Sequence, residues 1–513
     1  MSEQNGKVGT VYLVGSGPGD PGLITVKGQR LLEAADAIVY DRLAPESLLA
    51  YTRPEAELVY VGKKPGDHSM SQEDINATLV RLGKEGRQVV RLKGGDPYIF
   101  GRGSEEAIEL IEAGIPFEVV PGITSGVAAP AYAGIPVTHR GVSTSVAFIT
   151  GHEDPMKGRT DVDWSGIAHG ADTLVLYMGV GRLKEISTSL IAAGRPSDTP
   201  VAVVRWGTLA EQRTVTGTLS DIAEKVARAK LGPPAITVVG GVAALRGEGL
   251  GWFEARPLFG KKVVVTRARA QAGELSVKLE ELGAEVVEFP TIEIVPPDDF
   301  DPLDDAIRAL DSFEWLVFTS VNGVDAFTER LAHHDLDVRA IRQDAKIAAI
   351  GPATAERIRA SGLRVDVIPD EFRAEGLLDE IPAEKIKGRR ILIPRAKVAR
   401  EILPEKLRGA GAEVVVAPAY QSVSSNAGRA ALEKQLRAGE IDCITFTASS
   451  TVENFARVFG DEIPGLLHGA KVACIGPITT DTARKHGLTV HTEADEYTIP
   501  GLVRAVERLF AAG

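Results

Sequence analysis

The sequence predicts an α/β protein made of two successive α/β halves. Short β-branched runs alternate with helical patterns, as in VYLVG at 11–15, LITVKGQRLLEAADA at 23–37 and AIVYD at 37–41. The alternation breaks in RGEGLGWFEARPLFGKK at 246–262, which has no clean periodicity. We therefore expect a first domain over 1–247, a linker over 248–259 and a second domain over 260–513.

An internal repeat lies beyond that boundary. KKVVVTRAR at 261–269 matches GRRILIPRAK at 388–397, and LGAEVVEFP at 282–290 matches AGAEVVVAP at 410–418. LVFTSVNGVDAF at 316–327 matches ITFTASSTVENF at 444–455, and the segment 346–365 matches 471–490. Four pairs in the same order predict two similar α/β lobes with a ligand cleft between them.

Composition excludes several classes of function. The formal charge is −12, whereas a nucleic-acid-binding surface normally leaves a basic footprint. The sequence has two cysteines, both in strand-like apolar runs, and no histidine spacing typical of a metal site. The polar start MSEQNGKVGT and the absence of a run of 18 apolar residues predict a cytoplasmic protein without signal peptide or membrane span.

The first glycine-rich turn, in VYLVGSGPGDPG at 11–22, invites comparison with a dinucleotide-binding loop. Its glycines stand at 15, 17, 19 and 22, which is not the G-x-G-x-x-G spacing. Pro18 also removes a backbone N–H where a pyrophosphate needs donors. This spacing disfavours NAD binding.

Two further segments combine strands, glycines and polar groups. In RLKGGDPYIFGRGSEE at 91–106, Gly94 and Gly95 let the backbone approach a ligand, and Asp96 could accept hydrogen bonds from ribose hydroxyls. In VVPGITSGVAAPAYAGIPVTHRG at 119–141, Thr124 and Ser125 stand near a helix start, where each could equally be an N-cap.

Together these motifs resemble the uroporphyrinogen-III C-methyltransferases of the tetrapyrrole methyltransferase superfamily. The resemblance spans about residues 8–245 and includes TGH at 150–152, LVLYMGV at 174–180, VRWGTLAEQ at 204–212 and PPAITVVGGV at 233–242. It implies two α/β subdomains that hold S-adenosylmethionine, and typically a homodimer. The family's cofactor positions fall on Pro18, Gly94, Gly95, Asp96, Ile99, Thr124, Ser125, Met178 and Gly207.

The resemblance also implies two acid/base positions, Asp41 in YDRL and Lys63 in VGKK. A carboxylate such as Asp41 could accept the proton that must leave after methylation of a reduced pyrrole carbon. Lys63 could alternatively hold a substrate carboxylate. Both side chains could instead form ordinary surface salt bridges.

Each repeat of the second half opens with basic residues just after an expected strand. Arg267 and Arg395 are equivalent positions, as are Arg269 and Lys397. Cations at the carboxyl ends of parallel strands suit a ligand with several carboxylates, although solvated surface charge gives the same pattern. Hydroxyls of Thr319, Thr447 and Thr479 follow strands or begin helices, where they could bind a ligand or act as N-caps.

The second half resembles uroporphyrinogen-III synthase over about residues 260–510. That family's chain crosses twice between lobes, which implies lobe one over about 260–293 plus 424–513 and lobe two over about 296–421. Its candidate catalytic tyrosine falls on Tyr420, whose repeat equivalent is Ile292, and Thr479 falls on a threonine near the substrate. The family converts hydroxymethylbilane, with loss of water, to uroporphyrinogen III.

The two resemblances imply one bifunctional enzyme without a metal, because the second half's product is the first half's substrate. The expected final product is precorrin-2, on the branch to sirohaem or cobalamin. One alternative keeps the first chemistry with another precorrin substrate. A second alternative makes the bilobed half a non-catalytic tetrapyrrole-binding module.

Overall fold

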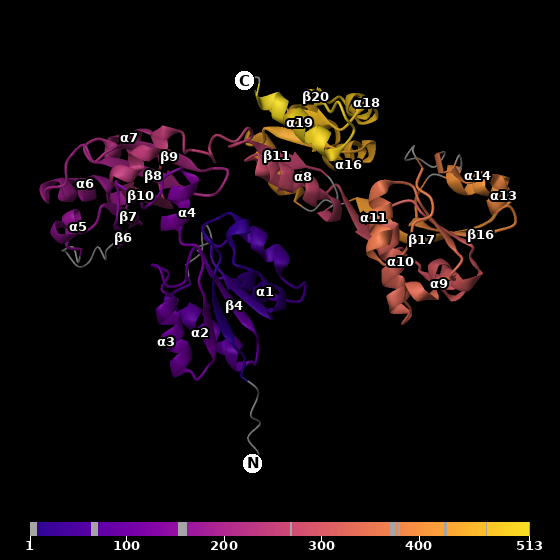
Figure 1. Ribbon diagram of the computed structural model, residues 1–513, viewed down its shortest axis with the longest axis horizontal. Helices are drawn as coiled ribbons and strands as arrows, with labels where there is room; N and C mark the ends of the chain where they lie inside the picture. Colours follow the sequence, from indigo (N-terminus) through magenta and orange to yellow (C-terminus); the bar gives the residue numbers. More distant parts are fainter. Residues whose placement is uncertain are drawn as a thin grey trace, which may run out of the picture. The chain divides into compact units, whose positions relative to one another are not determined.

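The computed structural model describes residues 8–62, 70–151, 162–266, 269–369, 376–377, 380–399, 401–424, 428–467 and 469–511. The chain divides into two compact units (Figure 1). The first runs to Lys262 and includes Leu279–Glu285, and the second contains Val263–Lys278 and Val286–Ala512. The described residues form four five-stranded sheets, two in each unit, which confirms the α/β class.

The first sheet of unit 1 is entirely parallel, with the order β3-β2-β4-β1-β5. Its strands are β1 (Val11–Gly15), β2 (Ala37–Tyr40), β3 (Glu57–Tyr60), β4 (Val89–Lys93) and β5 (Phe117–Val120), with helices α1 (Val26–Ala34), α2 (Gln72–Lys84) and α3 (Gly103–Glu112). All five carboxyl ends share one edge, so the loops that follow β1, β2, β4 and β5 meet there.

The second sheet of unit 1 is mixed, with the order β6-β7-β10-β8-β9. Only β6 and β7 pair in parallel, and the remaining pairs are antiparallel. The strands are β6 (Val146–Thr150), β7 (Thr173–Tyr177), β8 (Pro200–Arg205), β9 (Arg213–Thr218) and β10 (Ala235–Val239), with helices α5 (Trp164–Gly170), α6 (Leu183–Ala192) and α7 (Ile222–Arg228).

Helix α4 (Ser125–Tyr132) connects the two sheets of unit 1. It follows β5 of the first sheet, and its Ala129 is buried against Val175 and Val238 of the second. The start of α4 therefore lies where the carboxyl edge of the parallel sheet meets the second sheet.

Unit 2 contains the two lobes expected from the repeat. One sheet has the order β12-β11-β18-β19-β20 and the other β13-β17-β16-β14-β15. The strands of the first are β11 (Lys262–Val265), β12 (Glu285–Glu288), β18 (Cys443–Phe446), β19 (Lys471–Cys474) and β20 (Thr492–Glu493). Those of the second are β13 (Ile292–Val295), β14 (Trp315–Phe318), β15 (Lys346–Ala349), β16 (Arg390–Ala396) and β17 (Glu413–Ser424).

The helices of unit 2 connect these strands. They are α8 (Arg269–Glu281), α9 (Asp301–Arg308), α10 (Val321–His333), α11 (Pro352–Ala360), α13 (Ala383–Ile386), α14 (Ile402–Gly409), α15 (Arg429–Arg437), α16 (Ser449–Phe459), α17 (Ile463–Leu466), α18 (Pro477–Lys485) and α19 (Ile499–Ala511). None of the helices in the described ranges is long and apolar enough to cross a membrane.

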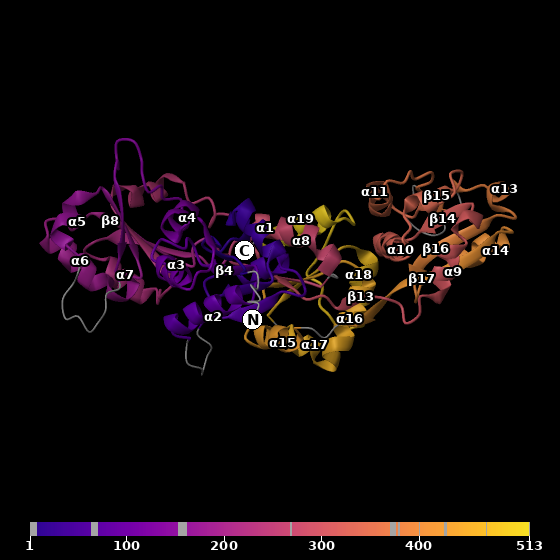
Figure 2. The same cartoon turned by 90° about the horizontal axis from the view of Figure 1, so that it is seen from below.

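The repeats exchange halves between the two sheets. The first repeat contributes β11 and β12 to one sheet and β14 and β15 to the other, and the second repeat completes each. Figure 1 accordingly shows β11 close to the yellow C-terminal helix α19, and α8 lies beside α19 in both views (Figures 1 and 2). The expected limit of lobe one at residue 293 falls inside β13, which pairs antiparallel with β17 of the other sheet.

Candidate functional sites

The loops after β1 and β4 are joined by backbone pairing. The Gly95 N–H donates to the Gly17 carbonyl at 2.7 Å, and the Gly17 N–H donates to the Gly95 carbonyl at 3.2 Å. The structure thus brings the segments that contain Pro18, Gly94, Gly95 and Asp96 together at one edge of the sheet. Gly94 is required there, because a Cβ atom would lie 2.6 Å from the Cβ of Leu43.

The Asp96 carboxylate organises these loops through backbone amides. Its Oδ1 accepts from the Tyr98 N–H at 2.8 Å, and its Oδ2 accepts from the Gly122 N–H after β5 at 3.0 Å. A carboxylate has about four lone-pair sites, so Asp96 retains capacity for a ligand hydroxyl. Its first function in the fold is nevertheless to connect the loops after β4 and β5.

The start of α4 is tied to the second sheet by Tyr177, which the sequence analysis did not single out. Thr124 precedes the helix, but its hydroxyl makes no cap bond and instead lies 2.7 Å from the Tyr177 hydroxyl. The same phenol oxygen accepts from the Gly126 N–H at 2.9 Å. Burial raises the pKa of Tyr177, which keeps its proton available for these bonds. Ser125 is the first residue of α4.

Strained backbone conformations concentrate in the predicted cofactor segments. Seven non-glycine residues in the described ranges have a left-handed φ, and five of them fall in the segments IFGRG, YMGV and RWGTL. These five are Phe100 (φ 52°), Arg102 (58°), Met178 (55°), Trp206 (48°) and Thr208 (77°). Such conformations cost about 1–3 kcal/mol each and persist where the surroundings enforce them, as at ligand sites.

The remaining predicted cofactor residues lie around the same loops. Met178 directly follows β7 and is half exposed. Gly207 packs on α4, where a Cβ would lie 2.3 Å from the Cβ of Ala129. Ile99 is partly buried against the core between α4 and the second sheet. The nine predicted positions thus belong to loops of both sheets, either at the carboxyl edge of the first sheet or on segments packed around α4.

Asp41 follows β2 and is held by a buried ionic cluster. Its Oδ2 accepts from Arg91 Nη2 at 3.0 Å, and its Oδ1 accepts from the Leu43 N–H at 3.0 Å. Arg91 and Lys93, on β4, both contact Glu106 Oε1, at 3.2 and 2.7 Å. Burial lowers the pKa of Lys93, and the positive charge of Arg91 adds to the effect.

This cluster fixes Asp41 while leaving its carboxylate accessible. The Asp41 side chain is 29% exposed, whereas Arg91 is 4% and Glu106 0% exposed. The signal in the sequence was the pair of basic residues inside the apolar strand QVVRLK, which a buried strand tolerates only with a partner. Lys63, the second predicted acid/base residue, lies outside the described residues.

In unit 2 the structure brings Tyr420 of β17 together with Arg395 at the end of β16 and with Lys397 directly after it. A bulge after Arg395 pairs Ala396 with Tyr420, and the Lys397 N–H donates to the Tyr420 carbonyl at 2.8 Å. The Tyr420 hydroxyl lies 3.0 Å from the hydroxyl of Ser320, the N-cap of α10. Its ring packs on the core of this lobe.

The predicted cations of this edge already have acidic partners. Arg395 is almost fully buried and pairs with Glu401. Lys397 is 45% exposed and pairs with Asp298, which also accepts from Gln421. Arg267 lies outside the described residues, and so does the Arg269 side chain. Of the predicted cations, only Lys397 is therefore both described and accessible to a ligand.

The predicted threonines belong to both sheets of unit 2. Thr319 follows β14, next to the Tyr420 edge, whereas Thr447 follows β18 and Thr479 lies in the first turn of α18. Thr479 is 5% exposed. The Ser449 hydroxyl donates to the Ile478 carbonyl at 3.3 Å, which joins the start of α16 to the start of α18.

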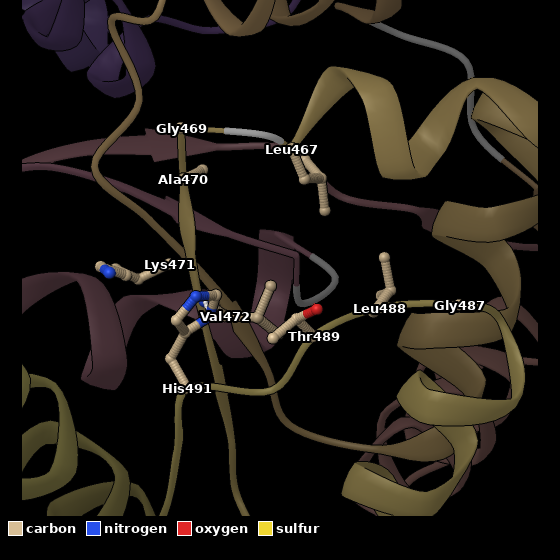
Figure 3. Close-up of a pocket in the computed structure, with 9 residues that line it drawn as sticks. All are labelled: Leu467, Gly469, Ala470, Lys471, Val472, Gly487, Leu488, Thr489 and His491. Atoms are coloured by element: carbon tan, nitrogen blue, oxygen red, sulfur yellow. Dashed lines mark hydrogen bonds between the residues drawn. The ribbon is translucent and has the colours of Figure 1, made fainter.

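A separate pocket of about 210 Å³ lies at the opposite end of β19 (Figure 3). His491 lies beside Val472 there, and its Nδ1 accepts from the Val472 N–H at 3.0 Å. None of the predicted site residues contributes to this pocket, which is lined by Leu467, Gly469, Ala470, Lys471, Val472, Gly487, Leu488, Thr489 and His491. Within the described ranges, no group of three or more His, Cys, Asp or Glu residues could hold a metal ion.

Comparison with known proteins identifies both halves. Residues 10–223 match the family model of tetrapyrrole (corrin/porphyrin) methylases, and residues 273–504 match that of uroporphyrinogen-III synthase HemD. A porphyrin biosynthesis protein HemD of Ruminiclostridium josui is 38% identical over 495 residues, which cover 96% of this chain and 97% of that protein.

Two further relatives are methyltransferases. A uroporphyrinogen-III C-methyltransferase of Bacillus subtilis is 43% identical over 71% of this chain and 74% of its own length. An S-adenosyl-L-methionine-dependent uroporphyrinogen III methyltransferase of Methanosarcina barkeri is 53% identical over 47% of this chain and 94% of its own length. The chain therefore belongs to the tetrapyrrole methylases through its first half and to the HemD uroporphyrinogen-III synthases through its second, and is a fusion of two enzymes of tetrapyrrole biosynthesis.

Proposed function

We propose that this chain cyclises hydroxymethylbilane to uroporphyrinogen III and then methylates uroporphyrinogen III twice with S-adenosylmethionine to give precorrin-2. The observation that carries the proposal is the presence of both family matches in one chain, at 10–223 and 273–504. The product of the second half is the substrate of the first, so the two activities form consecutive steps.

We place S-adenosylmethionine at the loops joined by Gly17 and Gly95. The residues proposed to hold it are Pro18, Gly94, Gly95, Asp96, Ile99, Thr124, Ser125, Met178 and Gly207. Three observations support this site: the convergence of backbone groups at one sheet edge, the glycines that admit close approach, and the strained residues around them.

The cofactor would supply an electrophilic methyl group, and the chain's contribution is alignment and proton removal. A reduced pyrrole carbon is already nucleophilic, so holding the reacting atoms about 3–3.5 Å apart gives most of the acceleration. Asp41 is the proposed base for the proton lost after methylation. Arg91 and the Leu43 N–H orient its carboxylate. The acid/base role of Lys63 stays a prediction.

For the synthase half we propose that the edge formed by Thr319, Arg395, Lys397 and Tyr420 contacts hydroxymethylbilane, together with Arg267, Thr447 and Thr479. Lys397 can exchange Asp298 for a substrate carboxylate at little cost, because exposed ion pairs contribute only about 0–1 kcal/mol. Arg395 is too buried to exchange Glu401 easily, so we assign it to orienting this edge. The cytoplasmic location and a homodimer also stay predictions.

The proposed function predicts a dimethylated product from the full chain. Incubation with hydroxymethylbilane and S-adenosylmethionine should give precorrin-2, detected by mass analysis. A cyclised product without added methyl groups would contradict the methyltransferase assignment. If methylation occurs only when uroporphyrinogen III itself is supplied, the second half is a binding module.

Substitution of Gly95 by valine should abolish S-adenosylmethionine binding. Gly95 has φ +69°, and the branched side chain would enter the space beside Thr124 and Ser125. Titration calorimetry measures the cofactor affinity, and the rate of hydroxymethylbilane turnover is the control, which should stay unchanged. Wild-type affinity in the variant would exclude this loop from the cofactor site.

Asp41→Asn should reduce the methylation rate by roughly 10²–10⁴-fold, because the amide keeps the shape but removes the base. Asp36→Asn is the matched control. Asp36 precedes the same strand β2 and likewise accepts from an arginine and a backbone amide, those of Arg53 and Gln88. Equal rates for the two variants would reduce Asp41 to a structural residue.

Tyr420→Phe should lower the synthase rate at least several-fold while leaving methylation and the melting temperature near wild type. The change deletes one oxygen and almost no packing, and the proposed role of that oxygen is to assist loss of the substrate hydroxyl. Ser320→Ala provides the comparison, since it removes the same hydrogen bond but keeps the phenol. Identical rates in both variants would assign the tyrosine only a structural bond.

A further inference from the structure

The stretch 248–259 belongs to unit 1 and packs on the methyltransferase half. Residues 252–254, which we call the strap, are Trp252, Phe253 and Glu254, inside the stretch that the sequence suggests is only a linker. Phe253 is 5% exposed, and the Trp252 indole N–H donates to the Ala131 carbonyl in α4 at 3.1 Å. Phe253 is thus packed into the fold, whereas Trp252 is 45% exposed and is held on α4 by its indole hydrogen bond.

The aromatic part of the strap holds Tyr132, the last residue of α4. The Tyr132 ring lies 5.0 Å from the Trp252 ring and 4.8 Å from the Phe253 ring, both edge to face. Its hydroxyl donates to Asp20 Oδ2 at 2.6 Å. Burial raises the pKa of Tyr132, and the Asp20 carboxylate adds to the effect, so the phenol remains the donor.

The acidic part of the strap holds Gln212. Glu254 Oε1 accepts from Gln212 Nε2 at 2.8 Å and from the Thr214 hydroxyl at 2.6 Å, and its Oε2 accepts from Arg246 at 2.5 Å. Gln212 is 2% exposed, and its Oε1 accepts from the Thr208 N–H at 2.9 Å. Glu254 accepts only, so it fixes which end of the Gln212 amide faces Thr208.

The contacts of Tyr132 with Asp20 and of Gln212 with Thr208 meet at the hydrogen bond between Asp20 and Thr208. The Asp20 N–H donates to the Thr208 hydroxyl at 2.9 Å. Asp20 stands two residues after Pro18, and Thr208 directly follows Gly207. Thr208 is buried and has φ +77°, a conformation that persists only where its surroundings enforce it.

We propose that Glu254 and Trp252 are positioning residues for S-adenosylmethionine binding, acting through Gln212 and Tyr132 on the loops of Thr208 and Asp20. The inference rests on the proposed function, because it takes these loops as part of the cofactor site. Removal of Glu254 leaves the Gln212 Nε2 group without this acceptor, so the amide oxygen is no longer held in place on the Thr208 N–H. The loop then relaxes from its strained conformation and must be reordered by the cofactor.

The test is Glu254→Ala in the full chain, with Glu248→Ala, an exposed acid of the same segment, as the matched control. Loss of this partly buried acceptor should raise KM for S-adenosylmethionine roughly fivefold or more, with kcat at saturating cofactor near wild type. Glu254→Gln still accepts from Gln212 and should recover part of the affinity. Trp252→Ala should raise KM in the same direction.

A double-mutant cycle separates positioning from general destabilisation. In a Gln212→Leu background, Glu254→Ala should add no further loss of cofactor affinity. The two hydrogen bonds through which Gln212 links Glu254 to Thr208 are already absent there. Additive losses, or an unchanged KM in folded Glu254→Ala protein, would overturn the inference.

Hydrogen exchange of segment 206–210 without cofactor distinguishes the inference from the proposed function. Faster exchange of this segment in Glu254→Ala than in Glu248→Ala supports the inference that the strap orders the Thr208 loop. Equal exchange in the two variants refutes it. Failure of the wild-type chain to bind S-adenosylmethionine at all would instead refute the proposed function, whatever the exchange result.

Discussion

The backbone pairing between Gly17 and Gly95 is the interaction on which the methylase half depends. It joins the loops after two neighbouring parallel strands, and Asp96 extends the connection to the loop after β5. Gly17 and Gly95 have left-handed φ values of +77° and +69°, so this paired conformation favours glycine at both positions. Backbone groups of these loops lie beside the Asp96 carboxylate at this edge, where a ligand of mixed polarity could lie.

Much of this arrangement could be predicted because it follows from strand direction. Once GSGPGD and KGGDP are assigned to strand ends of a parallel sheet, Pro18, Gly95 and Asp96 must share an edge. The exchange of lobes in unit 2 followed from the family resemblance, since a repeat alone is equally compatible with two independent lobes. The internal repeat nevertheless indicated the matching strand orders of the two sheets.

The rest could not be predicted, because it depends on partners distant in the chain. Tyr177 meets Thr124, and Arg91 meets Asp41, only after two separate elements have packed. The pairing of Lys397 with Asp298, 99 residues earlier in the chain, shows the same limit. A cluster of basic residues in a sequence does not reveal which of them the fold neutralises.

The exchange of repeat halves also has a consequence for synthesis on the ribosome. In lobe one, β11 pairs with β18, so Val263 must wait for Cys443 before its sheet can form. At about 5–20 residues per second, this interval is roughly ten seconds or longer, during which β11 lacks its partner strand β18. The methylase half has no such delay, since its strands all precede residue 240. During synthesis, all strands of the methylase half are therefore available before the synthase half can complete its first sheet.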